Sequence, residues 1–209
     1  MENNKNNTQL KGTEKLIMEA AKKIFGRKGL DGARMQEIAD EAGINKALVH
    51  YYFRSKDKLF ETVVNETFSS FFPKAMSLMS DPSISLFKKI ERFVDLYISL
   101  IQENPHIPGF MTQELGRGRA ERVLDMFKDS GLKPEVFFQQ IEQEIKAGTI
   151  VPITPVHLIV NMISMCIFPF IARPLLSGFL IMDKKDYDEF LEVRKKELPK
   201  FIINSIKKK

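Results

Sequence analysis

Apolar residues recur at intervals of three and four along almost the whole chain of 209 residues. This spacing places them on one face of an α-helix, because a helix completes one turn in about 3.6 residues. Gly and Pro bound the segments that carry the pattern, and no segment alternates apolar and polar residues over the length of a strand. The sequence therefore predicts an all-α fold.

Three helical segments are expected before residue 60. The segment 13–29 has one apolar face, formed by Leu16, Ile17, Ala20, Ala21, Ile24 and Phe25. A short helix over 35–42 ends at Gly43, and Asn45 then caps a second short helix over 46–53. An Asn side chain suits that position because its oxygen accepts a backbone N–H of the first turn.

Longer helices follow. We expect one from about Lys56 to Phe72 that stops at Pro73, and one after the Asp81-Pro82 cap with a stripe of Leu86, Ile90, Phe93, Tyr97 and Ile101. Further helices are expected over 134–147, 154–176 and 184–206.

The positive charge is concentrated at the N-terminal end. The chain carries a formal net charge of +5, and residues 1–60 contain 12 Lys and Arg against 8 Asp and Glu. Residues 61–209 contain 20 against 19, so they are nearly neutral. This asymmetry indicates that a nucleic-acid-binding module should be sought in the first 60 residues.

The single cysteine and the polar N-terminal residues favour a cytoplasmic protein. Cys166 is the only cysteine, so no disulfide can form within the chain. Residues 1–11 lack the apolar core of a signal peptide and read as a flexible polar arm. The stretch from Thr154 to Ala172 has no charged residue and approaches the length of a membrane span. It contains polar residues and two prolines, which favours a helix buried in protein over a membrane helix.

A short helix, a glycine turn and a capped second helix form the pattern of a helix-turn-helix. The second helix of this motif fits the major groove of DNA. Gly43 supplies the turn, and Ile38, Ala39 and Val49 are placed to hold the two helices together.

The stretch "MQEIADEAGINKALVHYYFRSKDKLF" closely resembles the signature of TetR-type transcriptional regulators. The resemblance covers about residues 12–65, with some ten positions in register. It implies a three-helix DNA-binding domain over residues 12–58 and an all-helical ligand-binding and dimerisation domain over residues 59–209. It also implies a homodimer that binds a palindromic operator in double-stranded DNA.

The resemblance implies the DNA contacts as well. Lys46 and Ala47 would reach bases, and His50, Tyr52 and Lys56 would contact phosphates, for which hydroxyl, imidazole and ammonium groups are suitable donors. The expected DNA-binding set is Arg34, Gln36, Asn45, Lys46, Ala47, His50, Tyr51, Tyr52 and Lys56. Packing alone favours the core for Tyr51, Phe53 and Leu59. The sequence departs from the family at Ala33-Arg34, Leu48 and His50, so the operator sequence cannot be carried over.

For the C-terminal region the resemblance implies a small-molecule effector, and the Phe- and Met-rich composition favours an apolar or aromatic one. The candidate ligand-binding residues are Phe87, Phe93, Tyr97, Phe110, Met111, Glu114, Phe127, Phe137, Met162, Met165 and Phe168. The same region is expected to form its dimer through helices near 154–176 and 184–206, with Ile163, Ile167 and Phe170 across the axis.

These features predict a ligand-responsive transcriptional repressor, released from its operator by a small apolar ligand. The alternative is a helical small-molecule binding or carrier module with no DNA function. No enzymatic motif is present, and we expect no cofactor. His106 and His157 lack metal-ligand spacing with Cys166, so no metal site is expected. An exposed position at a helix end is expected for Glu114.

Overall fold

The computed structural model describes residues 2–118, 120–121, 124–125 and 134–208, and their regular structure is helical. An isolated antiparallel bridge joins Ile150 to Lys207. The contacts divide the chain into two compact units. The first contains Met1–Ser69 and Asn104–Ala120, and the second contains Ser70–Glu103 and Glu121–Lys209.

The first unit is built from α1 (Glu2–Gly32), α2 (Met35–Ala42), α3 (Lys46–Phe53), the start of α4 (Lys56–Ser80) and α6 (Ile107–Gly116). Its helices pack on the predicted apolar face of α1, where Ile17, Ala20, Ala21, Ile24 and Phe25 are buried. Leu16 was placed on that face wrongly: it is 55% exposed, because it lies at the edge of the stripe. Helix α1 includes most of the expected polar arm, whose flexibility stays a prediction.

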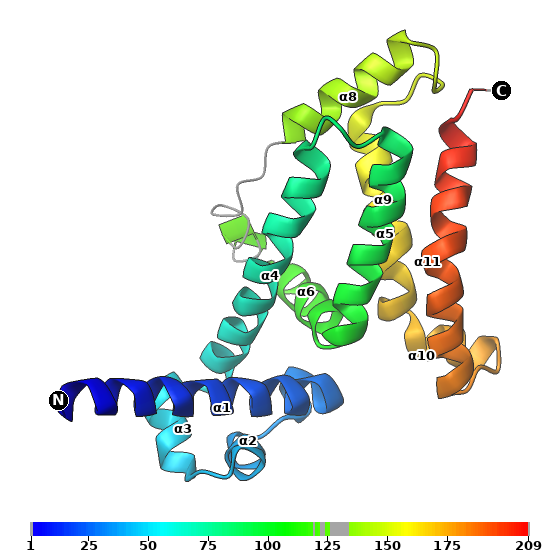
Figure 1. The fold of residues 1–209 in the computed structure, drawn as a ribbon. Coiled ribbons are helices and arrows are strands. Elements are labelled where there is room, and N and C mark those ends of the chain that lie inside the picture. The colour runs from blue at the N-terminus through cyan, green and yellow to red at the C-terminus, as the bar shows by residue number, and fades with distance from the viewer. Residues whose placement is uncertain (1, 119, 122–123, 126–133, 209) are drawn as a thin grey trace. The chain divides into compact units, whose positions relative to one another are not determined.

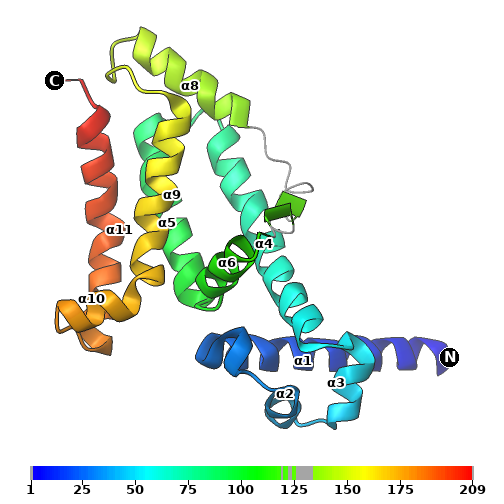
Figure 2. The same cartoon turned by 180° about the vertical axis from the view of Figure 1, so that it is seen from behind.

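The second unit contains the rest of α4, α5 (Leu86–Glu103), α8 (Pro134–Lys146), α9 (Pro155–Ile171), α10 (Arg173–Phe179) and α11 (Lys184–Ile206). Helices α9 and α11 both pack against α5, as both views show (Figures 1 and 2). One apolar cluster fills this unit, with Leu86, Ile90, Phe93, Val94, Ile98, Phe137, Ile141, Leu158, Met162, Cys166, Tyr187, Leu191, Leu198, Ile202 and Ile206 among its buried members. The predicted stripe of α5 is confirmed by this burial.

A buried lysine ties three elements of the second unit together. The Lys89 ammonium donates to the Met79 carbonyl oxygen at 2.7 Å and to Gln140 Oε1 at 2.6 Å. The Gln140 amide in turn donates to the Ile84 carbonyl oxygen at 3.0 Å. Burial lowers the pKa of Lys89, and the charge of Asp81 opposes that shift in part.

Hydrogen bonds link α11 to α9 next to a proline in α9. Pro169 has no N–H to donate to the Met165 carbonyl oxygen one turn earlier in α9. Arg194 of α11 takes that place, since its Nε and Nη2 donate to the same oxygen at 3.2 Å and 2.7 Å. The Tyr187 hydroxyl donates to the Pro169 carbonyl oxygen at 3.0 Å. The Arg194 bonds thus replace the backbone bond that proline removes, and the Tyr187 bond adds a second link between the two helices.

Beyond α1, which spans Glu2–Gly32 where a helix over 13–29 was expected, three further expected helix limits were wrong. Helix α4 runs through Pro73 to Ser80, because burial of Phe71, Phe72 and Ala75 outweighs one lost backbone bond. Helix α5 starts at Leu86, because the Asp81 carboxylate accepts from Ser83 and forms a turn there. The expected helix over 154–176 is interrupted after Ile171, and α10 begins at Arg173.

Among the described residues no single helix is long and apolar enough to cross a membrane. Helices α9 and α10 meet the length and composition criteria only as a pair bent by 67°.

Candidate nucleic-acid interface

Helix α3 is seated by two side chains on one face. Val49 and Phe53, four residues apart, are buried in the first unit. The helix begins after Asn45, whose Oδ1 accepts the Ala47 backbone N–H at 2.8 Å. The predicted cap is therefore confirmed, and it fixes where α3 starts.

The turn before α3 depends on Gly43. Its φ of 67° lies in the left-handed region, which a residue without a Cβ adopts at little cost. The Gly43 N–H donates to carbonyl oxygens of the last turn of α2. Ile38, Ala39 and Val49 are fully buried, so the contact predicted between the two helices is confirmed.

The opposite face of α3 is exposed. Lys46, Ala47 and His50 are exposed, and Tyr51 is 73% exposed. The assignment of Tyr51 to the core was wrong, because it lies away from the Val49–Phe53 face. The core assignments of Phe53 and Leu59 are confirmed by their burial.

His50 has a defined hydrogen-bonding state in this structure. Its Nδ1 lies 3.3 Å from the Arg54 carbonyl oxygen. A carbonyl oxygen only accepts, so Nδ1 carries the proton in this contact.

Tyr52 is half-buried between two other rings. Its ring meets that of Tyr51 edge to face, with centroids 5.5 Å apart, and the Phe53 ring at 6.3 Å. The three aromatic residues at the end of α3 thus support one another.

Helix α2 contributes two of the candidate residues. Arg34 is exposed at the N-cap, where its side chain offers no acceptor, and the Glu37 carboxylate accepts the Arg34 backbone N–H at 3.4 Å instead. Gln36 is exposed, and its amide donates to Asp40 Oδ1 at 2.8 Å.

Lys56 lies in a different environment from Lys46. Its ammonium is half-buried and donates to the Ala33 carbonyl oxygen at 3.0 Å and to the Asp31 carbonyl oxygen at 3.4 Å. These bonds tie the first residue of α4 to the segment that precedes α2. Lys56 thus helps to stabilise the helix-turn-helix. The residues next to it in the sequence did not indicate this role.

Ion pairs between α1 and α2 join residues far apart in the sequence, and no local pattern indicated them. Lys28 pairs with Glu37 at 2.8 Å, and Glu41 accepts from Arg27 at 2.9 Å and from Lys23 at 3.2 Å. These hydrogen bonds lower the pKa of both carboxyl groups. Arg54 was not among the expected DNA-binding residues. It is exposed at the C-cap of α3, with a φ of 56°.

The candidate ligand-binding residues lie in both units. In the second unit, the central cluster contains or is contacted by Phe87, Phe93, Tyr97, Phe137, Met162 and Met165. Burial raises the pKa of the Tyr97 hydroxyl. Phe168 is 56% exposed, and Phe127 lies outside the described residues.

Phe110, Met111 and Glu114 lie on α6, in the first unit. The expectation of an exposed Glu114 was wrong, because α6 turns it inward and leaves it 3% exposed. The described residues contain no group of three or more His, Cys, Asp or Glu side chains that could hold a metal ion.

Together these features define a helix-turn-helix DNA-binding domain followed by a helical C-terminal region. A family model described as bacterial regulatory proteins of the tetR family matches residues 17–63. The chain is 29% identical to the HTH-type transcriptional repressor NicS of Pseudomonas putida over 177 residues. This alignment covers 81% of each chain. It is 27% identical over 152 residues to the uncharacterized HTH-type transcriptional regulator YhgD of Bacillus subtilis, covering 68% of this chain and 74% of that one.

Solved structures share the fold. HlyIIR, a hemolysin II transcriptional regulator, superimposes with a TM-score of 0.62 at 24% identity, over 96% of this chain and 99% of HlyIIR. The transcriptional regulator FadR from Bacillus subtilis, solved with stearoyl-CoA, gives 0.65 at 13% identity, over 91% of this chain and 97% of FadR. The N-terminal region, residues 17–63, thus matches the tetR family, and the chain as a whole is similar to transcriptional regulators of this type.

Proposed function

We propose that this protein is a ligand-responsive repressor that binds a palindromic operator as a homodimer. The observation that carries the proposal is the exposed face of α3. Val49 and Phe53 hold the helix in place, while Lys46 and Ala47 stand exposed in the first turn after the Asn45 cap. Side chains at this end of a recognition helix meet base edges in the major groove.

Lys46 provides the sharpest test of the operator contact. A lysine in the first turn of α3 is placed to donate to guanine O6 or N7. Lys46→Ala should weaken binding to the cognate operator by about 1–3 kcal/mol and relax the preference at one base pair in each half-site. The operator is first selected from genomic fragments, and affinities are then measured by mobility shift on the operator and on random DNA.

Lys200→Ala is the matched control, because it removes the same charge from an exposed site in the second unit. It should leave the sequence preference unchanged. Equal weakening of all sequences by Lys46→Ala would contradict the base contact. Selection of no fragment at all would favour the alternative of a binding module without DNA function.

The dimer is proposed to form on an apolar face of the second unit. Along α9, Val156, Val160, Ile163 and Ile171 are all more than a third exposed and recur at helical spacing, with the half-buried Ile167 between them. Val193 and Phe201 of α11 are exposed as well. An apolar stripe of this extent is stabilised by a covering partner, and a second copy of the chain offers the same stripe.

The effector is proposed to be a small apolar molecule held by the second unit. Support comes from the aromatic and thioether side chains gathered there, which include Phe93, Tyr97 and Met162. FadR shares the fold and was solved with stearoyl-CoA, which has a long apolar chain. Helix α4 supplies residues to both units and is the proposed route by which ligand binding changes operator affinity.

Release from DNA tests this part of the proposal. Acyl-CoA thioesters and uncharged aromatic compounds are added to the operator complex, and the fraction bound is followed. We expect one of these classes of compound to release the operator. The concentration needed for release should differ at least fivefold between the Phe93→Ala variant and the unaltered protein. Operator binding that no such compound alters would contradict the apolar effector.

A further inference from the structure

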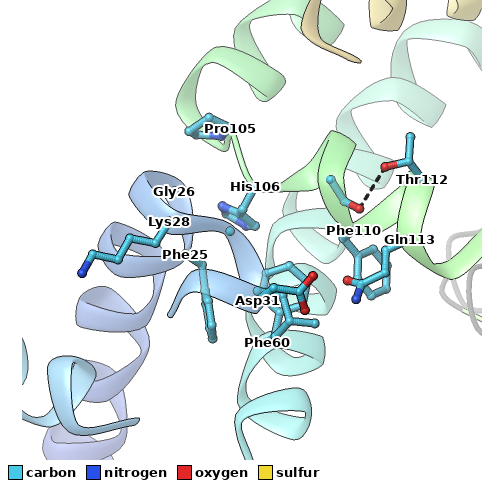
Figure 3. A pocket seen from close by; sticks show the side chains of 13 residues that line it. Phe25, Gly26, Lys28, Asp31, Phe60, Pro105, His106, Phe110, Thr112 and Gln113 are labelled. Atoms are coloured by element: carbon cyan, nitrogen blue, oxygen red, sulfur yellow. Dashed lines mark hydrogen bonds between the residues drawn. The ribbon is translucent and has the colours of Figure 1, made fainter. Parts of the chain in front are cut away.

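A pocket lies inside the first unit, with a volume of about 420 Å³. Its walls come from the end of α1, from Phe60 of α4, and from the segment that leads into and forms α6 (Figure 3). It is lined by Phe25, Gly26, Lys28, Gly29, Leu30, Asp31, Phe60, Pro105, His106, Gly109, Phe110, Thr112 and Gln113. Phe110 is the residue that it shares with the ligand-binding set expected from the sequence.

Glycine leaves the space open. A Cβ added at Gly109, in the first half of α6, would meet no atom within 4 Å apart from its immediate chain neighbours and the helix backbone. Gly29 has a φ of 66° and interrupts the regular path of α1 beside the pocket. A glycine inside a helix is less favourable than alanine, so Gly109 leaves a gap at the expense of helix stability.

His106 is a buried polar group of this pocket that lacks a partner. It is 4% exposed, and neither Nδ1 nor Nε2 has a hydrogen-bond partner. Its ring meets Phe60 at a centroid distance of 6.0 Å. A buried polar group without a partner costs free energy, so the ring calls for a group that supplies one. The neutral imidazole offers one N–H donor and one nitrogen acceptor.

Most of the other walls are apolar or already bonded. Phe25, Phe60 and Phe110 form an apolar layer behind the lining, where the Phe60 ring packs against Phe25 at a centroid distance of 4.6 Å and against Phe110 at 5.5 Å. The Thr112 hydroxyl donates to the carbonyl oxygens of Pro108 and Gly109 at 2.9 Å and 3.0 Å. The Lys28 ammonium is paired with Glu37, and the Asp31 carboxylate adds the opposite charge at an exposed position. The lining therefore carries one residue of each charge, which favours an uncharged ligand.

We propose that this pocket binds an uncharged aromatic amide or lactam, whose ring lies against the layer of three phenylalanines and whose polar edge bonds to His106. An amide carries both a carbonyl acceptor and an N–H donor, so it matches either tautomer of the imidazole. This site is separate from the apolar effector region proposed for the second unit.

Benzamide is the probe, because it combines one aromatic ring with one amide. The full-length protein is titrated without DNA, and the His106 ring resonances and the backbone amide spectrum are followed by NMR. Saturable shifts with half-saturation below about 10 mM are expected, a range that suits so small a ligand. Nuclear Overhauser contacts should join the benzamide ring to Phe25, Phe60 or Phe110. Toluene, which lacks the amide, should bind at least tenfold more weakly.

Two variants and a control locate the site. Gly109→Leu fills the space and should remove saturable binding, while His106→Phe should weaken it at least tenfold. Gly116→Leu is the matched control, since Gly116 also has open space around it on α6 but lies outside the pocket lining. It should bind benzamide as the unaltered protein does.

The proposal is overturned if no shift saturates, or if Gly109→Leu or His106→Phe binds as the unaltered protein does. A benzamide-soaked crystal with only water beside His106 would overturn it as well. If Gly109→Leu does not fold by circular dichroism, the Overhauser contacts in the unaltered protein decide. Because no DNA is present, failure of the repressor function leaves this test valid.

Discussion

At the scale of a single residue, the surroundings of His106 determine its protonation state. Burial is the main cause that lowers its pKa to about 4, and the charge of Lys22 contributes. The ring is thus neutral in the folded protein near neutral pH. The unfolded chain takes up the proton near the ordinary value of about 6.5.

This difference predicts a loss of stability in mild acid. The folded-state pKa is the lower one, so protonation favours the unfolded chain as pH falls from about 6.5 towards 4. His106 should therefore reduce the free energy of unfolding by about 2 kcal/mol between pH 7 and pH 5. Urea unfolding at both values measures this, and His106→Phe should lose most of the difference. Hydrogen bonds to Lys28 and to Lys23 and Arg27 lower the pKa of Glu37 and Glu41, so these carboxylates change stability only at a lower pH. The same pH dependence in the variant would contradict the assignment.

Lys56 gives a second prediction at this scale. Its ammonium holds two carbonyl oxygens of the segment before α2. Lys56→Met should lower the free energy of unfolding by about 1–2 kcal/mol, because hydrogen bonds from a charged group are lost. Lys46→Met, at an exposed site, serves as the control and should change stability by less than about 0.5 kcal/mol. Equal stability of the two variants in thermal unfolding would show that the Lys56 bonds contribute nothing.

At the scale of the element, prolines inside helices required contacts that local sequence does not reveal. Helix α9 passes through Pro169 because Arg194 of α11 bonds to the carbonyl oxygen that the proline leaves without its usual partner. Helix α4 passes through Pro73 by burying apolar residues on either side. In both helices tertiary packing outweighs a local rule.

The Arg194 bond can be tested by a double-mutant cycle. Arg194→Met should cost about 2 kcal/mol, because the Met165 carbonyl oxygen loses its donors. Pro169→Ala restores the backbone N–H that bonds to this oxygen in a regular helix. In that background Arg194→Met should cost less than half as much. Additive costs in chemical unfolding would show that the arginine and the proline act independently.

At the scale of the whole molecule, the exposed apolar stripe of α9 leads to the proposed dimer. Val160→Glu with Ile163→Glu should produce a monomer by analytical ultracentrifugation at micromolar concentration, because burying two carboxylates without partners is costly. Helical content by circular dichroism should stay the same. Leu16→Glu, at an exposed apolar site of the first unit, is the control and should leave the assembly unchanged. A dimer that persists in the double variant would place the interface elsewhere.

The local features of the helix-turn-helix could be predicted because they depend on residues close in sequence. Asn45 caps the helix that follows it, and Gly43 adopts the left-handed turn that its missing Cβ allows. The burial of Val49 and Phe53 on one face of α3 follows from helical periodicity. The all-α class and the resemblance of residues 17–63 to the tetR family rest on the same short-range patterns.

Tertiary structure alone decided what depends on residues far apart in the chain. It placed α6 in the first unit, brought His106 beside Phe60, and turned Glu114 inward. It also gave Lys56 its carbonyl partners and Met165 its arginine. Periodicity shows which face of a helix is apolar, but it does not show which helix covers that face. The helix that covers a face determines how far its residues are buried and which hydrogen-bond partners they find. These properties could therefore be seen only in the packed structure.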